Sequence, residues 1–242
     1  MHGSLAENKA LLDALKPVLG NLKGAGVAVC APYPYLAQLQ AELSGTPIAW
    51  GAQNVSEQPK GAFTGEVSTS MLKDFGCKYV IVGHSERRSI YGESDELVAK
   101  KYMAAQAAGL IPILCVGETL EERQAGQTEK VIESQLQGAL EGLVADELYE
   151  LVIAYEPVWA IGTGQVCDAP EANRICGWIR QWLAHHFEPE LGEHVRILYG
   201  GSVKASNAHE LLHQPEIDGA LVGGASLNAE EFEQITYCAR TH

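Results

Sequence analysis

The sequence has few basic residues for its size. It holds 17 lysines and arginines against 31 aspartates and glutamates, which gives a formal net charge of −14 over 242 residues. Such a charge repels nucleic-acid phosphates and anionic lipid, and the basic residues are scattered singly or in pairs. We therefore expect no nucleic-acid partner and no membrane partner.

Long apolar runs and paired cysteines are also missing. No uninterrupted apolar run approaches the ~20 residues that a helix needs to cross a bilayer. The six cysteines are dispersed, without a Cys-x-x-Cys pair. Hydrophobic residues make up 46% of the chain, which is ordinary for a globular protein. These features predict a globular protein of the reducing cytoplasm.

Glycine, by contrast, is frequent, and many of the 25 glycines follow short apolar runs. Apolar runs without polar alternation indicate strands that are covered on both faces, as in parallel sheets flanked by helices. Seven runs predict strands, at 27–31, 48–51, 79–83, 111–116, 151–155, 195–199 and 219–223. Eight segments with helical periodicity predict helices, at 4–19, 33–43, 68–75, 94–108, 120–143, 169–187, 206–213 and 229–240.

This alternation of strands and helices predicts one α/β domain over residues 1–242. A closed (β/α)8 barrel and an open doubly wound sheet both fit the pattern. Each of the seven predicted strands is followed by a helix, whereas the helix that opens the chain has no strand before it. The count favours a (β/α)8 barrel whose first strand is missing from this sequence.

Two predicted strand ends carry candidate catalytic side chains. His84 follows the strand at 79–83, and Glu156 follows the strand at 151–155. Barrels of this kind place their catalytic groups at the carboxyl ends of strands. Either residue alone has an equally good structural interpretation. Together, a carboxylate can remove a proton next to a carbonyl group while an imidazole polarises the oxygen, so the pair predicts an enzyme.

Further features surround these strand ends. Residues 157–167 have an apolar middle and two glycines, which predicts a lid that excludes water; the alternative is a loop packed permanently against a neighbour. Glycine pairs at 200–201 and 223–224 end the last two predicted strands, where barrels often bind phosphate through main-chain amides. Amide dipoles would allow an acidic protein to bind an anion.

Other reactive side chains are assigned to structural roles. His185 and His186 lie next to each other and near His194, but they lack the i, i+4 spacing of helical metal ligands, so no metal site is predicted. Cys115 lies inside a predicted strand and is expected to be packed rather than nucleophilic.

The chain resembles the triosephosphate isomerase family along its whole length. The matching motifs, in the order of the family, are the segments 51–54, 61–66, 82–88, 154–164, 199–203 and 221–226. The resemblance implies a TIM barrel and the interconversion of dihydroxyacetone phosphate and D-glyceraldehyde 3-phosphate through an enediol(ate). It also implies a role in glycolysis and gluconeogenesis, with no metal or organic cofactor.

The same resemblance implies roles for individual residues. Glu156 would be the base, His84 the electrophile at the carbonyl oxygen, and Glu86 a supporting acidic residue. Main-chain amides at four positions would hold the phosphate: Gly162, Ser202, Gly223 and Gly224. The family is usually a homodimer, which implies a partner docked at the loop around Thr64.

Two departures from the family stand out. The lid ends in Gln165-Val166-Cys167, where the family has a basic residue and two small ones, and this change can alter the hinge. The family also opens with a strand that ends in an Asn-x-Lys motif, which has no counterpart before Met1. We therefore expect an N-terminally truncated sequence. The alternative is a catalytically impaired barrel homologue that binds phosphorylated ligands.

Overall fold

Seven parallel strands form the centre of the molecule. The computed structural model describes residues 1–163 and 165–239. Its strands are β1 (Ala28–Ala31), β2 (Ala49–Ala52), β3 (Tyr79–Val82), β4 (Ile111–Val116), β5 (Val152–Tyr155), β6 (Arg196–Tyr199) and β7 (Gly219–Ala220). Each strand pairs in parallel with its neighbour in sequence, so the sheet order runs from β1 to β7. The seven predicted strands are confirmed.

Helices surround the sheet. In the described residues they are α1 (Leu5–Leu19), α2 (Leu36–Leu43), α3 (Thr69–Asp74), α4 (Ser85–Ile90), α5 (Asp95–Ala107), α6 (Leu120–Gln124), α7 (Thr128–Leu140), α8 (Ala169–His186), α9 (Pro189–His194), α10 (Ala205–Leu212) and α11 (Ala229–Cys238). Four 3₁₀ helices add η1 (Tyr33–Tyr35), η2 (Ala145–Glu147), η3 (Val158–Ala160) and η4 (Gly224–Leu227). Every one of the eight predicted segments contains a helix.

The predicted helix count of eight was too low. The segment 120–143 holds two helices instead of one, because Gly126 adopts a φ of 68°, which an α-helix cannot continue. The short helices α4 and α9 were not predicted at all. Arg240, the last residue of the final predicted helix, lies outside the described residues.

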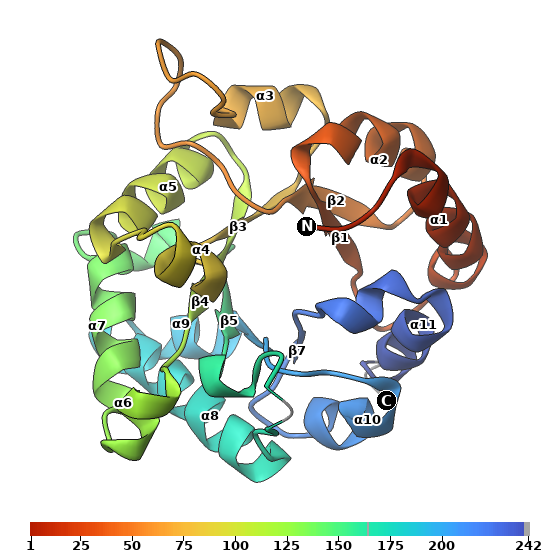
Figure 1. Cartoon of the computed structure of the whole chain (residues 1–242). Helices are drawn as coiled ribbons and strands as arrows, with labels where there is room; N and C mark the ends of the chain where they lie inside the picture. The colour runs from red at the N-terminus through yellow and green to blue at the C-terminus, as the bar shows by residue number, and fades with distance from the viewer. Residues whose placement is uncertain (164, 240–242) are drawn as a thin grey trace.

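Figure 1 shows the strands as a curled sheet inside a ring of helices. The ring closes where α1 packs against α11, so that the first and last helices are neighbours. Within the described part of the chain, β1 and β7 are the two ends of the pairing order. This architecture agrees with the predicted (β/α)8 TIM barrel with seven visible strands, and it gathers the carboxyl ends of the strands at one end of the ring.

Apolar side chains fill both faces of the sheet. Ile81, Ile113 and Cys115 belong to a cluster enclosed by the strands. Val80 and Val82, which alternate with Ile81 along β3, belong to the larger core that the helices cover. Both faces are therefore apolar, which explains the continuous hydrophobic runs in the sequence. Cys115 is fully buried in this packing, as expected.

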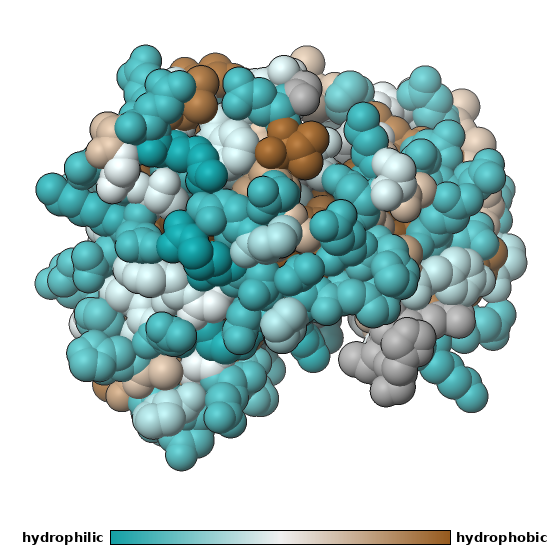
Figure 2. All heavy atoms as spheres, turned by 90° about the horizontal axis from the view of Figure 1, so that it is seen from below, coloured by the Kyte–Doolittle hydropathy of each residue, from teal (hydrophilic) through white to brown (hydrophobic). Residues whose placement is uncertain are grey.

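One face of the molecule is mostly polar. Figure 2 shows a face dominated by hydrophilic residues, with apolar residues in small separate groups. No helix in the described ranges is long and apolar enough to cross a membrane.

Candidate active site

The structure brings His84 and Glu156 together at the carboxyl ends of β3 and β5. His84 caps the N-terminus of α4, and Glu156 directly follows β5. Nε2 of His84 lies 2.9 Å from Oε2 of Glu156, with 25% of the His84 side chain exposed and 2% of the Glu156 side chain. A nearly buried carboxylate therefore faces an imidazole that solvent or a ligand can reach.

The backbone of α4 sets the tautomer of His84. The Glu86 N–H donates a hydrogen bond to Nδ1 of His84, at 3.2 Å. A ring nitrogen that accepts a hydrogen bond carries no proton in neutral imidazole, so we assign the proton to Nε2. Nε2–H then points at Glu156. This is the arrangement that a neutral imidazole needs in order to donate to an oxygen atom.

Glu156 strongly affects the titration of His84. Burial lowers the pKa of the imidazole, but the hydrogen bond to Glu156 and its negative charge raise it, and the net pKa shift is upward. A histidine pKa that is higher in the folded state stabilises the fold below the ordinary value of about 6.5, and this contribution disappears as the pH rises through the folded pKa.

We therefore expect Glu156→Gln to lower the pKa of His84. The substitution removes the negative charge, whereas burial and the Glu86 N–H remain, and both oppose protonation of the ring. NMR titration of the His84 ring protons measures the shift. The control is Glu86→Gln, because the Glu86 charge affects the pKa of His84 less than Glu156 does. Equal shifts in both variants would contradict this assignment.

Ser85 holds the Glu156 carboxylate from the other side. Its backbone N–H donates to Oε1 at 3.1 Å, and its hydroxyl donates to Oε2 at 3.2 Å. Together with His84, Ser85 therefore fixes the orientation of the Glu156 carboxylate. Ser85 was not singled out from the sequence, although it follows His84 directly within the motif at 82–88.

Gly117 allows the chain to approach Glu156 closely. It follows β4, which lies between β3 and β5 in the sheet. The Glu156 N–H donates to the Val116 carbonyl oxygen at 2.7 Å, and a Cβ atom on Gly117 would lie 1.6 Å from the Glu156 carbonyl oxygen. No side chain fits there, so glycine at this position allows the chain to hold Glu156 where it lies.

Gly117→Ala should consequently displace Glu156. We expect kcat to fall by about 10²-fold or more, because a shift of about 1 Å in a catalytic group has an effect of this size. Steady-state kinetics and thermal unfolding would be measured side by side. Gly26→Ala is the control, since a Cβ atom there meets nothing within 4 Å. Unchanged kcat in Gly117→Ala would show that the backbone contact is unimportant.

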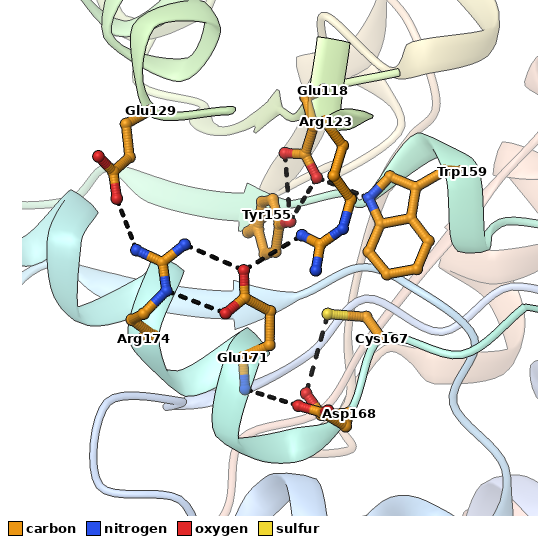
Figure 3. A network of polar contacts seen from close by, with 9 residues as sticks. All are labelled: Glu118, Arg123, Glu129, Tyr155, Trp159, Cys167, Asp168, Glu171 and Arg174. Atoms are coloured by element: carbon orange, nitrogen blue, oxygen red, sulfur yellow. Dashed lines mark hydrogen bonds and ion pairs between the residues drawn. The ribbon is translucent and has the colours of Figure 1, made fainter. Parts of the chain in front are cut away.

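A buried acidic residue, Glu118, fixes the residues on both sides of Glu156 (Figure 3). It accepts hydrogen bonds from the Tyr155 hydroxyl at 2.8 Å and from Nε1 of Trp159 at 2.6 Å. Burial raises the pKa of Glu118, although both donors oppose the rise. Sequence reasoning missed Glu118, because one carboxylate after a strand has no distinguishing pattern.

The segment 157–167 is packed at both ends. Trp159, Ala160 and Cys167 are buried, and the described residues exposed to solvent are 162–163 and 165–166. The apolar residues 158–161 are buried or half-buried, because η3 turns this part toward the core. Gly164 lies outside the described residues.

The remaining predicted site residues follow the carboxyl ends of strands. Ser202 and the pair at 223–224 follow the adjacent strands β6 and β7, and Gly162 lies on the segment after β5. The loop after β6 passes close to Glu156, because a Cβ atom on Gly200 would be 3.0 Å from Cγ of Glu156. Glu86 is largely exposed, with Oε2 3.9 Å from Nδ1 of His84.

A cavity of about 220 Å³ adjoins the carboxylate. Its lining includes Ser85, Gln135 and Glu156. In the described parts of the chain, no three or more His, Cys, Asp or Glu residues are grouped so as to hold a metal ion.

A curled parallel sheet ringed by helices, with an imidazole and a carboxylate at the carboxyl ends of its strands, defines a TIM-barrel protein with an acid–base site. The chain belongs to the triosephosphate isomerase family, whose model matches residues 1–239. The prediction of an isomerase of this family is confirmed.

Three curated relatives illustrate the similarity. The triosephosphate isomerase of Thiobacillus denitrificans is 61% identical over 239 residues, which cover 99% of this chain and 95% of the relative. That of Nitrosomonas eutropha is 51% identical over 241 residues, covering 100% and 95%. That of Cupriavidus necator is 53% identical over 235 residues, covering 97% and 94%.

Proposed function

We propose that the protein interconverts dihydroxyacetone phosphate and D-glyceraldehyde 3-phosphate in glycolysis and gluconeogenesis. The observation that carries the proposal is the 2.9 Å contact between His84 and Glu156 at the strand ends. The curated relatives are named triosephosphate isomerases, which favours an active isomerase over an impaired homologue that only binds phosphorylated ligands.

In this proposal Glu156 is the base. Its carboxylate removes a proton from the carbon next to the carbonyl group and returns it to the neighbouring carbon. Nε2–H of His84 donates to the carbonyl oxygen, where negative charge develops in the enediolate. As the carbonyl group moves to the other carbon, the hydroxyl proton of the substrate passes to this oxygen by way of the His84 ring. The two groups now contact each other, so the substrate oxygen has to replace Glu156 as the acceptor of the His84 proton. Ser85 holds the carboxylate in place through its N–H and its hydroxyl.

Main-chain amides would bind the phosphate group. The loops after β6 and β7 are neighbours, because Tyr199 and Ala220 are paired in the sheet. The amides of Ser202 and of the pair at 223–224 lie on these loops, and that of Gly162 lies on the segment after β5. Amide dipoles bind anions without basic side chains, which suits a chain with a net charge of −14.

The test is an assay that couples formation of dihydroxyacetone phosphate to oxidation of NADH. With D-glyceraldehyde 3-phosphate as substrate, we expect turnover by the wild-type chain and a loss of about 10³-fold or more in Glu156→Gln, which cannot accept the proton. Circular dichroism would verify that the variant is folded. Equal rates in both proteins would refute the role of Glu156.

We also propose a homodimer that forms through the loop around Thr64. Residues 59–66 are all exposed, the loop projects from the ring in Figure 1, and 44% of Phe63 is exposed at its tip. An exposed aromatic side chain on a projecting loop is typical of an interface.

Phe63→Asp should convert the dimer to a monomer, because it places a charge in the proposed interface. Light scattering coupled to size-exclusion chromatography measures the mass. Val144→Asp, an equally polar change at another exposed apolar residue, should leave the dimer intact. A wild-type protein that elutes as a monomer would refute the proposal.

We place the protein in the cytoplasm. All six cysteines are free thiols, and four of them are buried. Burial raises the pKa of the Cys30 and Cys167 thiols to about 12, which keeps them unreactive near neutral pH.

A further inference from the structure

One side chain, Arg123 of α6, contacts a residue near the start of the segment 157–167 and another just beyond its end (Figure 3). Its guanidinium carbon lies 4.4 Å from the centre of the Trp159 ring, near the start of the segment. Its Nη1 lies 3.1 Å from Oε1 of Glu171, just beyond the end of the segment. The cation of Arg123 thus contacts the aromatic ring of Trp159 and the carboxylate of Glu171.

Hydrogen bonds hold Trp159 in place near the start of the segment. Its indole N–H donates to Glu118 at 2.6 Å, and its carbonyl oxygen accepts a hydrogen bond from the Thr163 hydroxyl at 2.6 Å. Trp159 therefore contacts both the carboxylate of Glu118 and the cation of Arg123. Any movement of Arg123 changes the environment of the indole.

The first turn of α8 holds Glu171 in place just beyond the end of the segment. The backbone N–H of Glu171 donates to Oδ1 of Asp168, the N-cap, at 2.8 Å. Cys167, the last residue of the segment, is buried directly before this cap. The position of Glu171 therefore depends on the N-cap of α8, which directly follows the segment.

The ion pair between Arg123 and Glu171 is partly shielded from water. The exposed fractions of the two side chains are 31% and 22%, against 51% and 47% for the neighbouring pair of Arg174 and Glu129. Arg174 also binds Glu171, through Nε at 2.9 Å and Nη2 at 3.0 Å. Two guanidinium groups thus hold the Glu171 carboxylate, but only Arg123 reaches Trp159.

We propose that Arg123 and Glu171 are a positioning pair that couples the two ends of the segment 157–167. The proposal rests on the function proposed above, in which this segment presents the Gly162 amide to the phosphate. Arginine suits the role because its planar cation can stack on an indole and bind a carboxylate at the same time. Separating the two ends would weaken binding of the phosphate without altering His84 or Glu156.

The test compares Glu171→Gln with Glu129→Gln. Both remove one negative charge from the same network, but Glu129 contacts only Arg174 among the residues of Figure 3. We expect Glu171→Gln to raise KM for D-glyceraldehyde 3-phosphate by about two- to fivefold, the range for a partly exposed ion pair, with little change in kcat. Glu129→Gln should leave both constants unchanged. In a double-mutant cycle with Arg123→Gln, the effects on KM should not add.

A second readout does not depend on turnover. The protein is labelled with 5-fluorotryptophan, and the fluorine resonance of Trp159, one of four tryptophans, is assigned with Trp159→Phe. Glu171→Gln should shift this resonance in the absence of substrate, and Glu129→Gln should not. Indistinguishable Trp159 resonances in the two variants would overturn the proposal. A selective shift in a protein without isomerase activity would instead overturn the proposed function and leave the coupling intact.

Discussion

Replacing Glu156 by Asp is expected to lower kcat by about 10²-fold or more, because misplacing a catalytic group by about 1 Å costs this much. The shorter side chain withdraws the carboxylate by about one C–C bond, while the chain position stays fixed by the Val116 carbonyl. KM should change little, since main-chain amides, and not the Glu156 side chain, form the proposed phosphate site. The loss would then be confined to the chemical step.

Steady-state kinetics in both directions measure this effect. Glu129→Asp is the matched control, because it is the same change at an exposed carboxylate of α7. Its kcat should equal that of the wild type. A Glu156→Asp variant with unchanged kcat would mean that another group removes the proton.

Replacing Glu118 by Leu is expected to destabilise the fold by about 3 kcal/mol, since two buried donors lose their acceptor at about 1–3 kcal/mol each. These donors are the Tyr155 hydroxyl and the Trp159 indole N–H. For a chain of this size the melting temperature should fall by about 6–12 °C. Differential scanning calorimetry measures the change.

Glu118→Gln is the control, because its amide oxygen can still accept from both donors. It also tests the upward pKa shift that burial causes in Glu118. A carboxyl group with a raised pKa in the folded state binds its proton more tightly there, so its stabilising effect is present at low pH and is lost as the pH rises through the folded pKa. As the pH rises through the folded pKa of Glu118, the wild type should therefore lose stability relative to Glu118→Gln. A constant difference from pH 4 to pH 8 would contradict the shift.

The fold was largely predictable because its strands are apolar on both faces. Runs such as 111–116 contrast with the polar helices around them, and this contrast requires no knowledge of the neighbours in space. Helix α4 escaped prediction for the opposite reason. It buries none of its six residues, so it has no apolar face, and its start depends on the His84 cap.

The sequence predicted only those residues of the candidate site that are reactive side chains directly after a predicted strand. His84 and Glu156 satisfy that condition, whereas the partners that hold them do not. Ser85 contacts Glu156 across 71 residues of sequence, and Glu118 contacts Trp159 across 41. Gly117 resembles any glycine after a strand until the Glu156 carbonyl is placed beside it. Such contacts are set by the curvature of the sheet, which a single sequence does not reveal.

The contact between α1 and α11 also has a consequence for the order of folding. Every strand pairs with its neighbour in sequence, so the sheet can grow by adding one strand and one helix at a time. The contact between α1 and α11, by contrast, joins elements from opposite ends of the sequence, so it closes the longest loop in the molecule. It is therefore the natural last step of assembly and the first part of the ring to open under mild denaturation.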